Sequence, residues 1–190
     1  MRKSNLINVG LLSLFASAAP LVSSADEATR DPRALFRQAL AMYEDEKYQE
    51  GVDLLALAKE HLGEPPALDR ALIHYNTGIG YYRLSQPEKA AVAFQEALQT
   101  PDIETLGKAY FNLGNARYQV ARQALDQGDV ANAFKLYQAA ASNYVEAMRF
   151  DSTDRDAKIN YELSLMAQTR ILQMVALAMR HMKQGDQLVG

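Results

Sequence analysis

The chain has 190 residues, enough for one domain with a substantial core, and its 48% hydrophobic and 23% charged residues are typical of a globular protein. It contains no cysteine, which excludes disulfides, thiolate nucleophiles and cysteine-based metal sites. The net charge of −3 argues against a general nucleic-acid-binding protein.

Residues 1–25 have the order of a secretory signal peptide. Arg2 and Lys3 form a short basic region, residues 6–15 are mainly apolar, and small residues at 23–25 precede an acidic pair. The alternative is an uncleaved anchor, although the apolar run is short for a spanning helix. We expect export to a bacterial periplasm, with attachment to the inner membrane, facing the periplasm, as the alternative.

The rest of the chain predicts an all-α fold of seven helices in one domain, residues 26–184. Asp31 and Pro32 are typical of a helix start, and turn-forming stretches occur at 63–66, 85–87 and 100–102. Helical hairpins are predicted at about residues 33–62, 67–99 and 103–150. A final helix over residues 154–183 and a flexible tail at 185–190 complete the prediction.

Small and large residues recur at a fixed spacing along the chain. The clearest copy spans Leu106 to Asp156 and contains Asn112-Leu113-Gly114-Asn115, and weaker copies lie at residues 39–58 and 157–163. In another copy Ala90 lies twelve positions after Gly78, and Ala97 seven positions after Ala90. This pattern is typical of tetratricopeptide (TPR) repeats, pairs of antiparallel helices of about 34 residues. Gly114 is expected where two helix backbones approach closely.

The spacing also predicts that the third hairpin is elongated. Asn76 and Asn112 are 36 positions apart, close to one repeat, whereas Asn112 and Asn160 are 48 apart. The spacing of 48 exceeds one repeat of about 34 residues by about 14, and this excess divides into about seven residues on each side of the turn at residues 128–129. Seven residues are about two helical turns, so both helices lengthen while their apolar faces stay nearly aligned.

The final helix has no second helix with which to pair. Its apolar stripe is expected to pack on the last repeat as a cap, because a repeat array must cover its last apolar face. The alternative is that this methionine-rich stripe binds a partner or a membrane surface. The stripe contains Ile171, Leu172, Val175, Leu177, Ala178, Met179 and Met182, with Met174 beside it.

The sequence contains no catalytic or metal-binding pattern. His61, His74 and His181 lie on different predicted helices without ligand spacing, and His74 occupies a packing position of the repeat. Gly78 and Gly80 lie within a helix rather than after a strand, so they do not predict a phosphate loop. We therefore expect a non-enzymatic protein without a metal or a cofactor.

The concave face of the predicted array is the candidate binding surface, because four positions of each first helix point to it. Aromatic residues flanked by lysine and arginine suit an extended peptide, since rings supply apolar contact and cations meet backbone or carboxylate groups. The alternative is that the tyrosines are core packing between helices. The residues are Leu72, Tyr75, Ile79, Tyr82 and Arg83 in one repeat, and Lys108, Phe111, Asn115, Tyr118 and Arg122 in the next. Of these, Lys108, Asn115 and Arg122 are expected to face solvent.

Residues 105–170 resemble a narrower family. The run from Phe111 to Asn115, the elongated hairpin, and residues 143–151 and 156–163 are similar to the Bat and MxaK-like periplasmic TPR proteins encoded beside MoxR-type ATPases and von Willebrand A-domain (VWA) proteins. The chain departs from that family at Asp151-Ser152, where the family has Asp-Pro.

The resemblance implies an accessory role in assembling or maturing an envelope complex, with a VWA-domain or other envelope protein as the partner. The leading hypothesis is a protein–protein interaction scaffold or adaptor in the periplasm. Its alternatives are a membrane-anchored structural subunit of a MoxR/VWA-type complex and an enzyme accessory subunit. Nucleic acid is not an expected partner, and membrane association is expected only through the N-terminal segment or a partner.

Overall fold

The computed structural model describes residues 30–66 and 68–189, with side chains described up to residue 184. Seven α-helices and no strand occur in this part of the chain, which confirms the predicted all-α fold. The predicted signal peptide, residues 1–25, lies outside the described residues. The helices are α2 (Pro32–Glu44), α3 (Tyr48–Glu60), α4 (Arg70–Arg83), α5 (Pro87–Ala97), α6 (Ile103–Asp126), α7 (Val130–Phe150) and α8 (Arg155–Val189).

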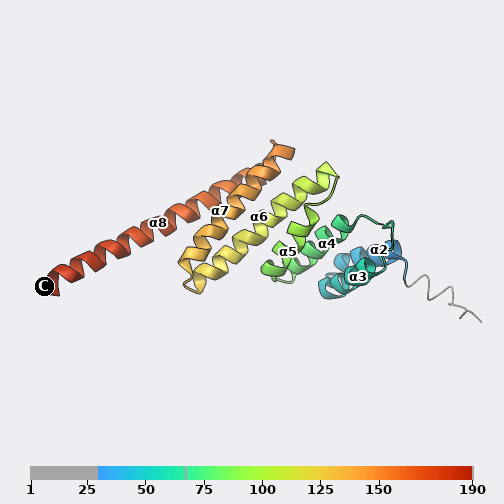
Figure 1. Ribbon diagram of the computed structural model, residues 1–190, viewed down its shortest axis with the longest axis horizontal. Helices are drawn as coiled ribbons and strands as arrows, with labels where there is room; N and C mark the ends of the chain where they lie inside the picture. Colours follow the sequence, from blue (N-terminus) through green and yellow to red (C-terminus); the bar gives the residue numbers. More distant parts are fainter. Residues whose placement is uncertain (1–29, 67, 190) are drawn as a thin grey trace, which may run out of the picture.

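Consecutive helices pack side by side as three hairpins followed by α8 (Figure 1). Three residues join the two helices of each hairpin, and the middle one always has a positive φ: Glu46 at 60°, Ser85 at 57° and Gly128 at 81°. Glycine adopts this conformation without the steric cost that a β-carbon brings. The three turns therefore share one backbone conformation, and only the third has a glycine at the position with positive φ.

Aspartate side chains fix where the first helix of each hairpin and α8 begin. Asp31, Asp69, Asp102 and Asp154 each accept a hydrogen bond from a backbone N–H of the following turn. A carboxylate at this position satisfies a free donor and interacts favourably with the positive end of the helix dipole. The second hairpin was predicted from residue 67, but its helix begins at Arg70 because Asp69 is the cap.

Glycine on the first helix allows the second helix of a hairpin to approach closely. A β-carbon added to Gly114 would lie 2.6 Å from the ring of Tyr144, and one added to Gly78 would lie 2.6 Å from the ring of Phe94. Both rings are almost completely buried, with 1% and 0% of their surface exposed. A close approach of the two helix backbones was predicted at Gly114, but it is the ring of Tyr144, rather than a backbone, that lies against this glycine.

A polar contact joins the first helices of successive hairpins at one recurring place. Tyr43 Oη donates to the Asn76 carbonyl (2.9 Å), Asn112 Nδ2 donates to Tyr75 Oη (3.1 Å), and Asn160 Nδ2 donates to Asn115 Oδ1 (3.0 Å). Asn76, Asn112 and Asn160 are the residues whose spacing located the elongation in the sequence. Each of these asparagines thus takes part in a contact with the preceding first helix, although the partner differs from one contact to the next.

The third hairpin is longer than the other two. α6 has 24 residues and α7 has 21, whereas the four helices before them have 11 to 14. Residues 120–125 and 138–143, which contain the predicted extensions, are helical throughout. The prediction that both helices of this hairpin lengthen is confirmed, and seven residues add roughly 10 Å to each.

α8 covers α7 only along its first half. Ala157, Ser164 and Ile171, each seven residues apart, are buried at 0%, 0% and 3% exposure, whereas every side chain from residue 172 to residue 184 is exposed. Figure 1 shows α8 running on past the end of the α6–α7 hairpin. Ile171 packs in one cluster with Val130, the first residue of α7. The turns of α8 after Ile171 therefore have no residue of α7 to pack against.

Two predictions about the end of the chain are therefore wrong. The stripe of the final helix was expected to pack on the last repeat, but of its residues only Ile171 is buried. The final helix was predicted to end at residue 183, but α8 continues to Val189. None of the helices in the described part is long and apolar enough to cross a membrane.

The close contact at Gly114 predicts that Gly114→Leu lowers the free energy of unfolding by about 1–3 kcal/mol through overpacking against Tyr144. Urea unfolding followed by circular dichroism measures this change. Gln138→Leu adds the same side chain at an exposed position of α7 and is expected to have little effect. Equal stability of the Gly114→Leu protein and the parent would contradict the packing described here.

Candidate functional site

α6 lies at the centre of the predicted concave face, between α4 and α8. Three hollows follow it from its start to its end, with volumes of about 860, 170 and 910 Å³. The middle and end hollows share Tyr118 and Leu163, so they are continuous. The start hollow shares no lining residue with the other two, and we call the three hollows, which follow one another along α6, the α6 groove.

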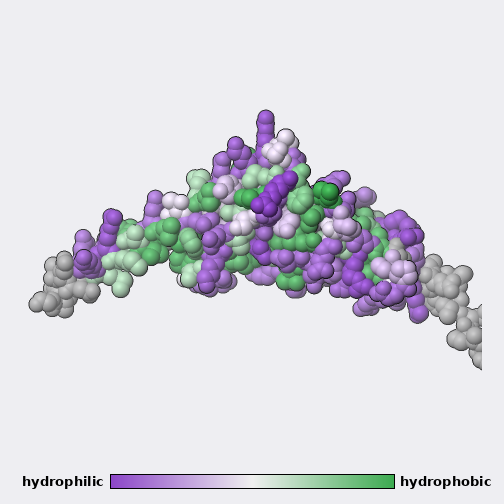
Figure 2. All heavy atoms as spheres, turned by 45° about the horizontal axis from the view of Figure 1, so that its top comes forward, coloured by the Kyte–Doolittle hydropathy of each residue, from purple (hydrophilic) through white to green (hydrophobic). Residues whose placement is uncertain are grey.

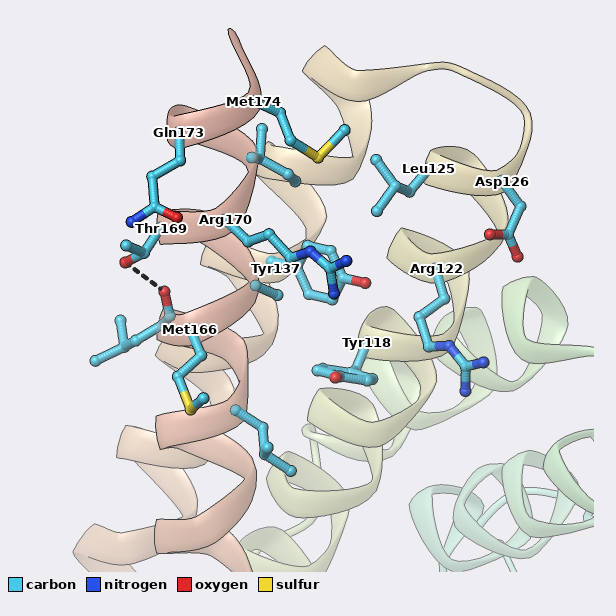
Figure 3. Close-up of a pocket in the computed structure, with 14 residues that line it drawn as sticks. Tyr118, Arg122, Leu125, Asp126, Tyr137, Met166, Thr169, Arg170, Gln173 and Met174 are labelled. Carbon is cyan, nitrogen blue, oxygen red and sulfur yellow. Dashed lines mark hydrogen bonds between the residues drawn. The ribbon is translucent and has the colours of Figure 1, made fainter. Parts of the chain in front are cut away.

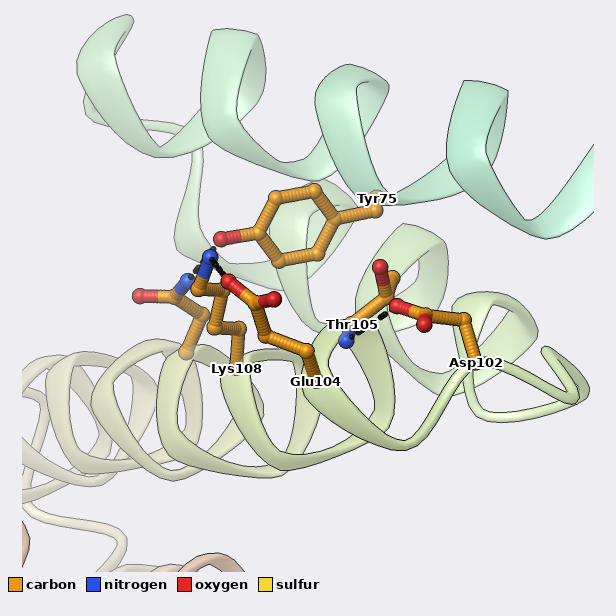
Figure 4. A network of polar contacts seen from close by, with 6 residues as sticks. Tyr75, Asp102, Glu104, Thr105 and Lys108 are labelled. Atoms are coloured by element: carbon orange, nitrogen blue, oxygen red, sulfur yellow. Dashed lines mark hydrogen bonds and ion pairs between the residues drawn. The ribbon is translucent and has the colours of Figure 1, made fainter. Parts of the chain in front are cut away.

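The start of the groove combines aromatic rings with one lysine. Tyr75 reaches from α4 toward α6, where its hydroxyl accepts a hydrogen bond from Asn112 (Figure 4). Burial raises the pKa of Tyr75, so its hydroxyl stays protonated at neutral pH. Lys108 is exposed, but its ammonium lies 2.5 Å from Glu104 Oε1, and this hydrogen bond raises the pKa of Lys108. Lys108 therefore acts as half of an ion pair rather than as a free cation.

The rim of this first hollow is acidic. Hydrogen bonds from Thr105 lower the pKa of Asp102, and hydrogen bonds from Thr153 lower the pKa of Asp151, so both carboxylates are ionised at neutral pH. The lining contains four carboxylates, Asp102, Glu104, Asp151 and Asp154, and one cationic side chain, Lys108. This end of the groove is suited to a positively charged group.

A hydrogen-bonded asparagine lines the middle of the groove. Asn115 Oδ1 accepts one hydrogen bond from Tyr144 Oη (2.9 Å) and another from Asn160 Nδ2 (3.0 Å). These bonds tie α6 to α7 and to α8 through a single oxygen atom. Asn115 was predicted to face solvent, but it is half-buried, and its acceptor is already occupied. Its primary role is therefore to join three helices.

The end of the groove is basic and contains sulfur and aromatic groups. Tyr118 packs edge-on against Tyr137, with ring centroids 5.0 Å apart. Arg122 of α6 and Arg170 of α8 line the same hollow, and Arg170 extends from α8 toward α6 (Figure 3). Asp126 is the one acidic residue in the lining of this hollow. This end is suited to a carboxylate or another anion.

The structure brings seven of the ten predicted residues into the groove. Tyr75, Lys108 and Phe111 line the start, Tyr82, Asn115 and Tyr118 line the middle, and Tyr118 and Arg122 line the end. The other three, Leu72, Ile79 and Arg83, are absent from the lining of these hollows. Tyr75, Ile79 and Tyr82 also pack against the buried cluster around Phe94, so the core and groove interpretations of these residues both apply.

Sequence analysis missed the wall of the groove that α8 provides. Met166, Arg170, Gln173 and Met174 line the end hollow, opposite α6. A signal for two of them was present, because the 48-residue spacing that relates Asn112 to Asn160 also relates Tyr118 to Met166 and Arg122 to Arg170. The final helix was interpreted only as a cap, although Met166 and Arg170 occupy positions in it that correspond to groove residues of α6.

His74 lies outside the groove and is half-buried beside α5. Its Nδ1 atom lies 2.7 Å from Glu96 Oε2. Burial lowers the pKa of His74, and the neighbouring Glu96 carboxylate opposes this change. Within the described residues no group of three or more histidine, aspartate or glutamate side chains is arranged to hold a metal ion.

No protein-family model matches the chain, and a search of curated proteins found no match.

The bonds to Asn115 predict a specific pattern of stabilities. Asn115→Ala leaves the buried Tyr144 hydroxyl without its acceptor, which costs about 1–3 kcal/mol of unfolding free energy. Tyr144→Phe in the same protein removes that unpaired hydroxyl and should restore part of the loss. Urea unfolding of the two single variants and the double variant measures the coupling. Purely additive effects would mean that the hydrogen bond contributes nothing.

Proposed function

We propose that the protein is a non-enzymatic TPR scaffold that binds an extended segment of a partner protein in the α6 groove. The observation that carries this proposal is the charge polarity of the groove. Four carboxylates surround its start, and Arg122 and Arg170 stand at its end. A segment with a basic group at one end and an acidic group at the other matches both ends at once.

The dimensions of the groove support a short peptide as its ligand. Eighteen residues separate Glu104 from Arg122 along α6, which corresponds to roughly 27 Å. An extended chain covers that distance with about eight residues. Tyr82, Phe111, Tyr118 and Met166 offer apolar contacts between the charged ends. Aromatic and methionine side chains at such a surface supply affinity, while the charges set orientation and partner choice.

The proposed setting is the bacterial periplasm, with the protein accessory to the assembly or maturation of an envelope complex. The signal-like residues 1–25 and the resemblance to Bat and MxaK-like proteins support this setting. A VWA-domain or other envelope protein is the proposed partner. The alternative is a membrane-anchored subunit of a MoxR/VWA-type complex, and the N-terminal sequence of the exported protein distinguishes the two. A mature start near Asp26 supports the periplasmic scaffold.

Reversing the charge at the basic end is the direct test of the groove. Arg122→Glu with Arg170→Glu should weaken partner binding by about tenfold to a hundredfold, because two cations that face an anionic group become repulsive. Photocrosslinking from position 119, in the lining of the middle hollow, measures the binding in living cells. Lys135→Glu with Lys158→Glu is the matched control, since both lysines are exposed and neither lines the groove.

A truncation separates the groove from the end of α8 as the docking element. Ending the chain after Met174 keeps the buried Ile171 and the α8 residues that line the groove, and it removes the exposed turns that follow. The groove hypothesis predicts that this shortened protein keeps its crosslinks, whereas the double arginine variant loses them. Crosslinks that persist in the arginine variant and disappear in the truncation would assign partner binding to the end of α8.

A further inference from the structure

The last part of α8, residues 172–189, extends beyond the hairpin on which the helix packs, and we call it the arm. From residue 172 to residue 184 its side chains are apolar to an unusual degree for an exposed helix. Met174, Met179 and Met182 are 49%, 65% and 70% exposed, and Leu172 and Leu177 are 58% and 54% exposed. Figure 2 shows hydrophobic surface continuing along the arm. Contiguous apolar surface of this kind marks an interaction site.

The apolar stripe of the arm continues the face with which α8 packs on α7. The buried residues Ala157, Ser164 and Ile171 recur every seven positions, and the next position in this series is Ala178. Met174, Val175 and Met182 lie three or four positions from Ala178 and therefore on the same side of the helix. The arm thus presents a helix-packing face at the point where α7 has ended.

The surroundings of this face favour a helix, rather than a membrane surface, as its binding partner. The hairpin tip, residues 126–129, stands on the same side of α8, because Leu125 and Asp126 line one hollow with Ile171 and Met174. A bilayer lying against the arm would meet this tip. A helix in line with α7 meets no such obstacle.

We propose that the occupant is the arm of a second copy of this chain, packed antiparallel in a two-fold symmetric dimer. A stripe that pairs with itself satisfies the symmetry of such an interface. Met174, Val175, Ala178 and Met182 carry no charge, and His181, three positions after Ala178, is the one ionisable side chain on the same side within the described part of the arm. Arg180 and Lys183 are exposed on the remaining sides of the arm, and its described side chains include no acid.

Dipole direction also favours the antiparallel arrangement, because an antiparallel arm runs toward the hairpin tip of its partner copy. The C-terminal end of the arm then approaches the N-terminus of α7, and opposite ends of two helix dipoles attract. A parallel pair would instead place the two sets of basic side chains beside each other.

Full overlap of the two arms defines a register that can be tested. The midpoint of residues 172–189 falls between Arg180 and His181, so the two-fold axis passes there. Met182 then lies roughly 4.5 Å along the helix from its symmetry mate, on the packed face. Arg180 is closer to the axis along the helix but lies on the opposite side.

Cysteine crosslinking tests this register, because the chain has no cysteine of its own. Met182→Cys should form a disulfide-linked dimer under mild oxidation, whereas the control Arg180→Cys should remain mostly monomeric. Equal crosslinking of the two variants would overturn the proposed face. The absence of crosslinking in both variants would overturn the proposed dimer.

Sedimentation equilibrium tests the association without added cysteines. The purified protein should dimerise in a concentration-dependent manner, and Met174→Gln with Met182→Gln should raise the dimer dissociation constant by roughly a hundredfold. Both residues are exposed, so helicity should be unchanged. The control Met166→Gln alters an exposed methionine that lines the groove and should leave dimerisation intact. A protein that stays monomeric, or that binds phosphatidylglycerol vesicles through the two arm methionines, would overturn the proposal.

Discussion

The structure depends on how closely the two helices of each hairpin can approach. In the second and third hairpins a ring from the second helix lies against a glycine of the first, as Phe94 does on Gly78 and Tyr144 does on Gly114. In the first hairpin the order is reversed, and Tyr43 of the first helix lies against Gly51 of the second. No other residue type leaves room for these rings, and the rings in turn fill the space that would otherwise be a void. The contact fixes which side of each first helix faces its hairpin partner. The opposite side is then left for the concave face, where the α6 groove forms.

Elongation of the third hairpin changes what that concave face can hold. Because α6 is longer than α4, its last turns extend past the second hairpin and find α8 as their neighbour on the concave side. Arg122 and Arg170 come from these two helices and line one hollow. A third hairpin of ordinary length would end before Arg122 and would leave the groove without its basic end. The length of α6 is thus what gives the groove its basic end and, with it, its charge polarity.

Features that depend on local interactions could be predicted from the sequence, whereas features that depend on contacts between distant residues could not. Helix order, the hairpin turns and the elongation could be predicted, because repeat spacing and helix periodicity are local properties of the chain. The groove was predicted in part, since its residues occupy repeat positions. The pairing of Lys108 with Glu104 and of Asn115 with Tyr144 and Asn160 was not predicted, because rotamers and neighbours from other helices decide it. The exposure of the stripe on α8 was missed for a related reason. Periodicity identifies an apolar face but does not show where the helix that covers it ends.

Hydrogen exchange of the protein with and without its bound partner is the most direct test of the claim that the α6 groove is the binding surface. The account predicts slower exchange on α6 from residue 108 to residue 126 and on the facing turns of α8 from residue 159 to residue 171. The arm should exchange equally in both states, because the dimer that protects it is present in each. Protection confined to the arm or to the first hairpin, with α6 unchanged, would contradict the account.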